Sequence, residues 1–212
     1  MLSFFRKITK LFIKFFDLFL PNFISKRIKQ LLFNFLVYTK SSFVKVNKQF
    51  TYLNQPLILI GQIQRSGGTL LTQLFDKHPN LISHPYEIYI GYPKKWNWPK
   101  IKILETKKNP TKTFNKLSNR VTQESLVFGY SKFSNPENKN EIIDFKFNYI
   151  YQKKLFKRLI KNKKLKNKRN ILNIWFTSYF NSFQKINLMK KKFIFGFVPR
   201  FNLYEKNIEN FF

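Results

Sequence analysis

The sequence predicts an α/β fold built on a parallel sheet, and three observations lead to that prediction. Two short apolar runs, at 56–62 and 193–198, have the length and continuous hydrophobic character of strands buried on both faces. The first run is followed by a glycine-containing turn and then by a segment with helical periodicity. Further helical segments lie between the two runs, as expected when helices cover a sheet.

The 212-residue chain is long enough for one α/β domain and an appendage. Its aromatic content of 19%, with 27 Phe, is sufficient for a packed core and excludes a disordered chain. We expect a basic, amphipathic helical appendage over residues 1–50 and the α/β domain over 51–212.

Charge is the most unusual global property of the chain. Forty Lys and Arg against ten Asp and Glu give a formal net charge of +30, which is typical of a protein with an anionic partner. Nucleic acid, a membrane surface and a phosphorylated ligand all fit. A composition rich in Lys, Asn, Ile and Phe also accounts for the bulk charge, and we favour this interpretation. Only seven of the basic residues are arginine, the side chain best suited to specific phosphate recognition. The individual arginines are therefore the first candidates for specific contacts with phosphate.

Cysteine and histidine usage limits the chemistry. The chain has no cysteine, which excludes disulfides and thiolate metal sites and fits a reducing, cytoplasmic location. His78 and His84 lie six residues apart without a matching set of ligands, so no metal site is expected.

The first 38 residues predict two basic amphipathic helices, at 3–20 and 22–38, separated by Pro21. Neither has the roughly 18 uninterrupted apolar residues that a membrane span requires. Two interpretations stay open. The pair lies on an anionic membrane surface, which would make the protein membrane-associated, or it packs its Phe stripes on the domain that follows.

The rest of the domain is assigned from periodicity and from turn residues. We expect a helix at 68–77, a short strand at 81–83, an irregular excursion or lid at 92–140, helices at 144–160 and 171–188, and a last helix from Leu203. The basic run KNKKLKNKRN at 161–170 is either a nucleic-acid or membrane contact or, as we favour, a solvated helix end and loop.

The segment ILIGQIQRSGGTLL, at 58–71, contains three of the six glycines in the chain. A strand, a glycine turn and a helix form an anion-binding arrangement, because the backbone can approach a phosphate and the helix start offers free N–H groups. Alignment with the Walker A pattern puts Gly68 where the lysine belongs and Gln62 where the first glycine belongs. That lysine contacts the β- and γ-phosphates, so an ordinary ATP or GTP enzyme is disfavoured.

The cation of this turn lies on its other side, at Arg65. The match runs from about Leu57 to Glu87, where QRSGGTLL and LFDKHPNL resemble the sulfotransferase family. The phosphosulfate loop of that family commonly reads RSGTTLL, so Gly68 is a departure, and a helix exit like LLDxHP follows. The resemblance implies a nucleotide-binding, P-loop-like, three-layer α/β domain that uses 3′-phosphoadenosine-5′-phosphosulfate as sulfuryl donor, without a metal.

Sulfuryl transfer moves negative charge onto a leaving phosphate, which a guanidinium and a row of N–H groups stabilise. We expect Arg65 to supply the guanidinium. The alternative is a strand-to-helix turn with a surface arginine. The residues expected to bind the cofactor are Gln64, Arg65, Ser66, Gly67, Gly68, Thr69 and Leu70.

The acceptor also needs a general base. In several sulfotransferases a carboxylate shortly after the second strand has this role, and the resemblance assigns it to Glu87. His84 is the competing base. Glu87 could equally be an acid favoured by the dipole of a helix start. His78, beside Pro79, is expected to be a structural helix-end residue.

The second signature of the family, a 3′-phosphate site with an Arg-Asp-Pro-like strand end, is not found in the sequence. Arg200 follows Pro199 without an adjacent Asp, and capping of the strand is its favoured role. The family order of elements puts the motif soon after Phe212, where the last segment is still apolar. We therefore expect an N-terminal part of the domain, incomplete at its C-terminus, and leave open whether it is active alone.

The resulting prediction is a sulfotransferase acting on a hydroxyl or amine of a small-molecule, carbohydrate or lipid acceptor. Trp96 and Trp98 are candidate stacking surfaces for that acceptor, or core residues. The alternative is a basic peripheral membrane or nucleic-acid-binding protein without catalysis, although the scarcity of arginine disfavours nucleic acid. A nucleotide kinase with a degenerate loop is a third, weaker option. The sequence does not predict an oligomeric state.

Overall fold

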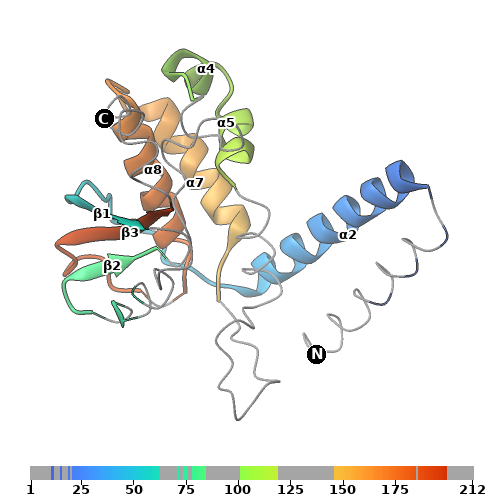
Figure 1. Cartoon of the computed structure of the whole chain (residues 1–212), viewed down its shortest axis with the longest axis horizontal. Helices are drawn as coiled ribbons and strands as arrows, with labels where there is room; N and C mark the ends of the chain where they lie inside the picture. The colour runs from blue at the N-terminus through green and yellow to red at the C-terminus, as the bar shows by residue number, and fades with distance from the viewer. Residues whose placement is uncertain are drawn as a thin grey trace, which may run out of the picture.

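A computed structural model of the chain describes residues 11, 15, 19, 21–62, 71, 74, 75, 78–84, 101–118, 146–184 and 186–199. The strands and helices named within this part are α2 (Asn22–Phe43), β1 (Leu57–Gln62), β2 (Leu81–Ser83), α4 (Ile103–Lys108), α5 (Pro110–Leu117), α7 (Tyr149–Asn162), α8 (Lys168–Phe180) and β3 (Phe193–Pro199). Figure 1 shows the sheet on one side of the helices α4, α5, α7 and α8, with α2 extending away from them.

The three strands form a parallel sheet in the order β1-β3-β2. The central strand β3 pairs with β1 along the whole length of β1, from Leu57 opposite Ile194 to Gln62 opposite Pro199. β2 is shorter, and its last residue, Ser83, lies opposite Phe195. The strand predictions at 56–62, 81–83 and 193–198 are confirmed, and the fold is α/β.

Both faces of this sheet are packed against other parts of the chain. Successive residues of a strand point to opposite faces, so Ile194 and Phe195 report on one face each. Ile194 joins the main hydrophobic core together with Ile82, which lies opposite it. The next residue, Phe195, is buried on the other face, where its ring centroid lies 4.6 Å from that of Phe75. The N–H of Phe75 donates to the carbonyl of Leu71, which is helical. This arrangement fits the helix, sheet, helix layering of an α/β domain.

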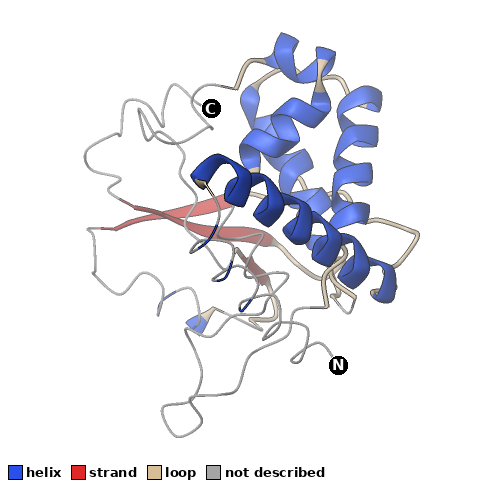
Figure 2. Ribbon diagram, turned by 90° about the vertical axis from the view of Figure 1, so that its right-hand side faces the viewer, coloured by secondary structure: helices blue, strands red, loops and turns tan. Residues whose placement is uncertain are grey.

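On the face of Ile194, helix α8 is buried between the sheet and a second layer of helices (Figure 2). All residues from Ile171 to Phe180 are buried. Phe176 contacts His84, which follows β2, with 5.9 Å between ring centroids. Trp175 contacts Phe114 of α5 at 5.6 Å. A helix buried all round has to be apolar nearly all round, and ILNIWFTSYF meets that condition.

The prediction of an irregular excursion over 92–140 was wrong for its central part, which contains α4 and α5. These helices are short; α4 has no side-chain cap at its start, whereas α5 has one and buries Thr113, Phe114 and Leu117 on one face. The side chain of Asn109 accepts a hydrogen bond from the N–H of Lys112 at 2.9 Å, and Pro110 occupies the first turn of α5. Residues 92–100, including Trp96 and Trp98, and 119–140 lie outside the described residues.

Two helix boundaries also differ from the predictions of 144–160 and 171–188. α7 begins at Tyr149 and runs to Asn162, and α8 runs from Lys168 to Phe180. The stretches just before α7 and just after α8 pair with each other instead: Phe147 and Phe183 form an antiparallel bridge, and the N–H of Asn148 donates to the carbonyl of Ser182 at 2.8 Å. Helical periodicity carries no information about backbone hydrogen bonds between segments that are distant in the sequence, so it could not predict these helix ends.

The predicted helix at 22–38 is confirmed as α2, which extends to Phe43. Of the predicted helix at 3–20, the described residues Leu11, Phe15 and Phe19 are helical. No helix in the described part of the chain combines the length and apolar character needed to cross a membrane. The predicted helix from Leu203 lies outside the described residues, and the domain boundary at residue 50 stays a prediction.

Candidate functional site

The candidate site is at the carboxyl edge of the parallel sheet. β1 ends at Gln62 and β3 ends at Pro199, and these two residues are register partners. The segments that follow both strands therefore leave the sheet at the same place. In open parallel α/β sheets, ligands bind outside the carboxyl ends of the strands.

The glycine turn starts at this edge. Gln62 is the last residue of β1, and Leu71, nine residues later, is already helical. The sequence-predicted strand and helix thus flank the turn on both sides. The predicted residues that lie outside the described part of the chain are Gln64, Arg65, Ser66, Gly67, Gly68, Thr69, Leu70, Glu87 and Arg200. Their roles stay predictions.

His84 is the one predicted site residue that the structure describes. Its side chain is only 7% exposed, and its ring lies among Phe176, Tyr179 and Phe180 of α8, at centroid distances of 5.9, 5.1 and 6.5 Å. Its backbone N–H donates to the carbonyl of Phe195 at 2.9 Å. The imidazole therefore lies in the interface between the sheet and α8.

β2 ends well short of the carboxyl edge. Its last residue, Ser83, is level with Phe195, four residues before the end of β3 at Pro199. His84 follows directly and is thus at mid-height of the central strand. At about 3.3 Å per residue, four residues correspond to roughly 13 Å. His84 and the glycine turn are therefore separated along the strand direction.

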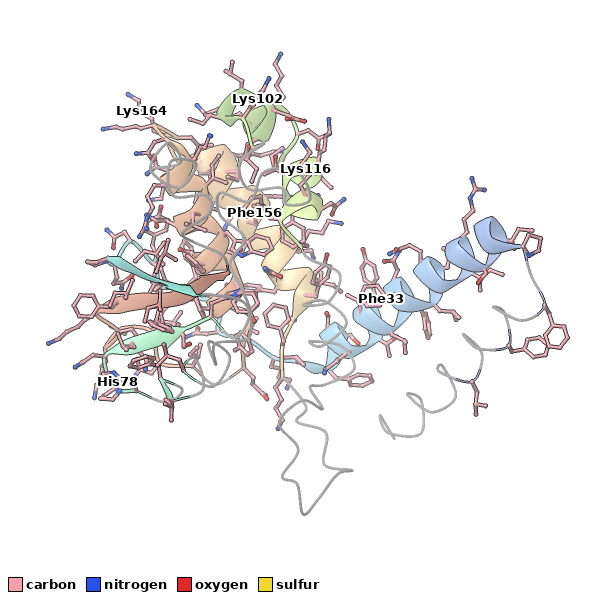
Figure 3. All side chains as sticks on the ribbon, viewed as in Figure 1. Phe33, His78, Lys102, Lys116, Phe156 and Lys164 are labelled. Atoms are coloured by element: carbon pink, nitrogen blue, oxygen red, sulfur yellow. The ribbon has the colours of Figure 1, made fainter. Side chains whose placement is uncertain are left out.

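His78 has the structural position that the sequence predicts. Its Nδ1 accepts a hydrogen bond from the N–H of Asn80 at 3.2 Å, and its carbonyl accepts one from Nζ of Lys191 at 2.6 Å. Its N–H donates to the carbonyl of Phe75. Figure 3 shows His78 beside β2. These contacts fix the turn at Phe75 and His78 against the loop before β3.

The basic run at 161–170 belongs to the opposite end of the sheet. Its members divide between the end of α7, a loop and the start of α8, and the lysines from Lys161 to Lys166 are exposed. Arg169 is the exception that sequence patterns did not indicate: it donates to the carbonyl of Gln55 at 3.1 Å, and burial lowers its pKa. Gln55 precedes β1, so the contact of Arg169 lies at the end of the strand opposite to Gln62, about 20 Å away by the length of the strand.

A second contact that the sequence prediction missed fixes the segment leading into β1. The side-chain amide of Asn181 accepts from the N–H of Thr51 and donates to its carbonyl, both at 2.8 Å. Two residues on, the N–H of Leu53 donates to Oγ1 of Thr177 at 2.9 Å. These residues of α8 and its C-cap hold β1 in register. The predicted helix over 171–188 placed Asn181 inside a helix, and the prediction therefore missed its position at the C-cap of α8.

No group of three or more acidic or histidine residues in the described ranges could hold a metal ion. The structure therefore offers no metal ligand set at this edge from the residues that it describes.

Comparison with known proteins gives one informative similarity. Protein-tyrosine sulfotransferase 1 of Rattus norvegicus is 51% identical to this chain over 39 residues, which is 18% of this chain and 10% of that protein. The chain therefore spans about a tenth of the length of this curated relative. No family model matches the chain, and no solved structure matches it. The similarity points to the sulfotransferases as a class of transferase.

Proposed function

We propose that the chain belongs to a sulfotransferase that moves a sulfuryl group from 3′-phosphoadenosine-5′-phosphosulfate to a hydroxyl or amine acceptor. The observation that carries the proposal is the position of QRSGGT, directly after a parallel strand whose carboxyl end lies beside that of β3. The 39-residue similarity to a sulfotransferase supports the same class. This arrangement would make the domain P-loop-like in its use of a strand, a turn and a helix.

In the proposed reaction, an acceptor oxygen or nitrogen forms a bond to sulfur as the bond from sulfur to the bridging oxygen of the 5′-phosphate breaks. Negative charge develops on the leaving phosphate. Arg65 and the N–H groups of residues 66–69 would stabilise that charge, with the hydroxyls of Ser66 and Thr69 as further donors. The acceptor proton passes to a general base.

Glu87 is the base that we propose, in preference to His84. The ring of His84 packs among three aromatic rings of α8 and lies at mid-height of β3. Glu87 is four residues beyond Ser83, and Pro199 is four residues beyond Phe195, its register partner. The chain between Ser83 and Glu87 is therefore long enough to reach the carboxyl edge where β1 ends.

For the acceptor, the relative is named for protein tyrosine, and a phenolic hydroxyl is therefore the first acceptor to test. Carbohydrate and lipid hydroxyls are the others that the proposal allows.

The proposal is tested by binding of adenosine 3′,5′-bisphosphate, the nucleotide product, measured by titration calorimetry. Arg65→Ala removes a charge-assisted contact to the 5′-phosphate, and we expect affinity to fall by about tenfold or more. Arg27→Ala is the matched control, because Arg27 is exposed on α2, and it should leave affinity unchanged. Equal affinity of Arg65→Ala and wild type would contradict the proposal and favour a binding protein without catalysis.

A transfer assay separates the two candidate bases. With labelled phosphosulfate donor and a tyrosine peptide, Glu87→Gln should lower kcat by roughly a hundredfold or more, while bisphosphate affinity changes little. His84→Phe keeps an aromatic ring in the aromatic interface and should retain most of the activity. The reverse pattern, in a His84→Phe variant whose thermal unfolding is unchanged, would make His84 the base.

A further inference from the structure

Helix α2 has an apolar stripe whose C-terminal half is exposed in the described part of the chain, while Ile24 and Ile28 are half-buried. Its members follow one another at spacings of four and three residues, which places them on one side of a helix. We define the α2 stripe as Ile24, Ile28, Leu31, Phe35 and Tyr38. The side chains of Leu31, Phe35 and Tyr38 are 68%, 63% and 56% exposed.

The opposite side of α2 contacts the body of the protein. Val37, Lys40 and Ser41 are buried. Oγ of Ser41 accepts a hydrogen bond from the N–H of Tyr149, at the start of α7, at 3.1 Å. Just past the helix, the carbonyl of Val44 accepts one from the side chain of Asn148 at 2.9 Å. At about 100° per residue, Lys40 and Val37 lie across the helix from Leu31, whereas Ser41 lies at the border between the two sides.

The exposure of the stripe side chains bears on the interpretation in which the N-terminal helices pack their apolar stripes on the domain. Leu31 and Phe35 of the predicted stripe are not packed on the described part of the domain, because both side chains are exposed. Phe15 and Phe19 of the preceding segment are also exposed, at 55% and 68%. The end of α2 anchors the helix on α7, and Figure 1 shows the rest of α2 extending from the body.

Charge limits what can cover the stripe. No Asp or Glu occurs between Asp17 and Asp76, whereas α2 carries Lys26, Arg27 and Lys29 beside its apolar residues. The chain as a whole has a formal net charge of +30. A second copy would bring like charges together, whereas an anionic surface would attract them. Ile24, Ile28 and Leu31 of the stripe are aliphatic and suit acyl chains, whereas arginine, the side chain best suited to phosphate recognition in nucleic acid, occurs only once in the sequence of α2, at Arg27.

We propose that α2 is a membrane-surface helix that lies in the interface of an anionic lipid bilayer, with the α2 stripe inserted among the acyl chains. The basic residues at its start contact the anionic headgroups. The anchor on α7 holds the domain at a fixed orientation to the bilayer. This surface is on α2 and is independent of the proposed nucleotide site.

Co-sedimentation of the full chain with vesicles tests the proposal. We expect strong binding to phosphatidylcholine vesicles that contain about 30% of the anionic lipid phosphatidylserine. Binding to vesicles of phosphatidylcholine alone should be much weaker. Leu31→Ser with Phe35→Ser should lower the partition coefficient by about tenfold or more, because two large apolar side chains are lost from the bilayer. The control, Leu104→Ser with Met189→Ser, changes side chains that are 76% and 85% exposed elsewhere and should have no effect.

A labelling experiment locates the inserted side. The chain has no cysteine, so Phe35→Cys gives one attachment point for an environment-sensitive fluorophore. Its emission should shift to the blue on addition of anionic vesicles, and the emission of the same label at Leu104→Cys should not. Absence of a shift at residue 35 would overturn the proposal, as would unchanged binding of the Leu31→Ser, Phe35→Ser variant.

Two other results would also overturn the proposal. If the double variant abolishes self-association in sedimentation velocity and leaves vesicle binding unchanged, a second copy covers the stripe. If the double variant loses affinity for RNA while its binding to vesicles is unchanged, the α2 stripe binds nucleic acid and not the membrane. Arg65→Ala should not alter vesicle binding, so failure of this proposal and failure of the nucleotide proposal are distinguishable.

Discussion

At the scale of single residues, the polar side chains inside α8 position the strand that leads to the candidate site. Thr177 is fully buried, and Asn181, at the C-cap, is nearly so. Their oxygen and amide groups pair with the backbone of Thr51 and Leu53, which precede β1. Buried backbone N–H and C=O groups need hydrogen-bond partners. In this segment the side chains of Thr177 and Asn181 provide the hydrogen bonds that a neighbouring strand would provide in a sheet.

Asn181→Ala should therefore destabilise the domain. Both hydrogen bonds to Thr51 are lost, and buried backbone groups are left without a partner, so we expect the free energy of unfolding to fall by about 1–3 kcal/mol. Urea titration followed by circular dichroism measures this change. Asn54→Ala is the control, because Asn54 is exposed in the same segment. Equal stability of the two variants would show that the amide does not hold the segment.

Residue-level prediction from sequence succeeded where local chemistry decides the outcome. His78 precedes a proline at the end of a helical segment, and its contacts are structural as expected. It failed for Asn181 and Arg169, whose partners are 130 and 114 residues away in the chain. Neither a periodicity nor a motif contains information about such distant partners.

At the scale of elements, strands were predicted better than helix ends. β3 is a short apolar run because both of its faces are covered at Ile194 and Phe195, whereas β1, at the edge of the sheet, is apolar although Ile58 is 37% exposed. The ends of α7 and α8 were wrong because the flanking residues Phe147 and Phe183 pair with each other. α4 and α5 were missed because they are only six and eight residues long, and their hydrophobic pattern is correspondingly short.

The junction of α2, α5 and α7 is a pH-sensitive contact between elements. Tyr149 packs on Phe114, and its backbone N–H bonds to Ser41 of α2. Burial raises the pKa of the Tyr149 phenol to about 12, and a hydrogen bond with Ser118 partly opposes that shift. The neutral phenol is therefore favoured in the folded state relative to the unfolded chain, in which tyrosine titrates near pH 10.

The sign of the effect follows from that difference. The contribution of Tyr149 is fully present below about pH 10 and is lost as the pH rises toward 12, by up to about 2–3 kcal/mol. Tyr149→Phe should remove this part of the alkaline destabilisation, so its unfolding midpoint should fall less between pH 9 and 12 than that of wild type. Parallel pH curves for the two proteins would contradict the assignment.

At the scale of the whole molecule, two surfaces with different chemistry are separated. β1 and β3 end together at the carboxyl edge of the sheet, where the sequence continues into the glycine turn, and α2 carries a partly exposed apolar stripe. The excess positive charge suits both proposals, since phosphosulfate nucleotides and acidic lipids are both anionic. The sequence predicted the α/β class because apolar runs and helical periodicity are local signals. The geometry of the turn depends on residues 63–70, which lie outside the described residues.

The central claim is that the turn after β1 holds a phosphosulfate nucleotide through Arg65 and not a nucleoside triphosphate through a lysine. The most direct measurement is a calorimetric comparison of adenosine 3′,5′-bisphosphate and ATP binding to the wild-type chain, repeated with Arg65→Ala. The account predicts that the bisphosphate binds more tightly than ATP, because the turn lacks the lysine that contacts the β- and γ-phosphates, and that Arg65→Ala weakens bisphosphate binding and so reduces this preference. Tighter binding of ATP, or a preference that persists in Arg65→Ala, would contradict it.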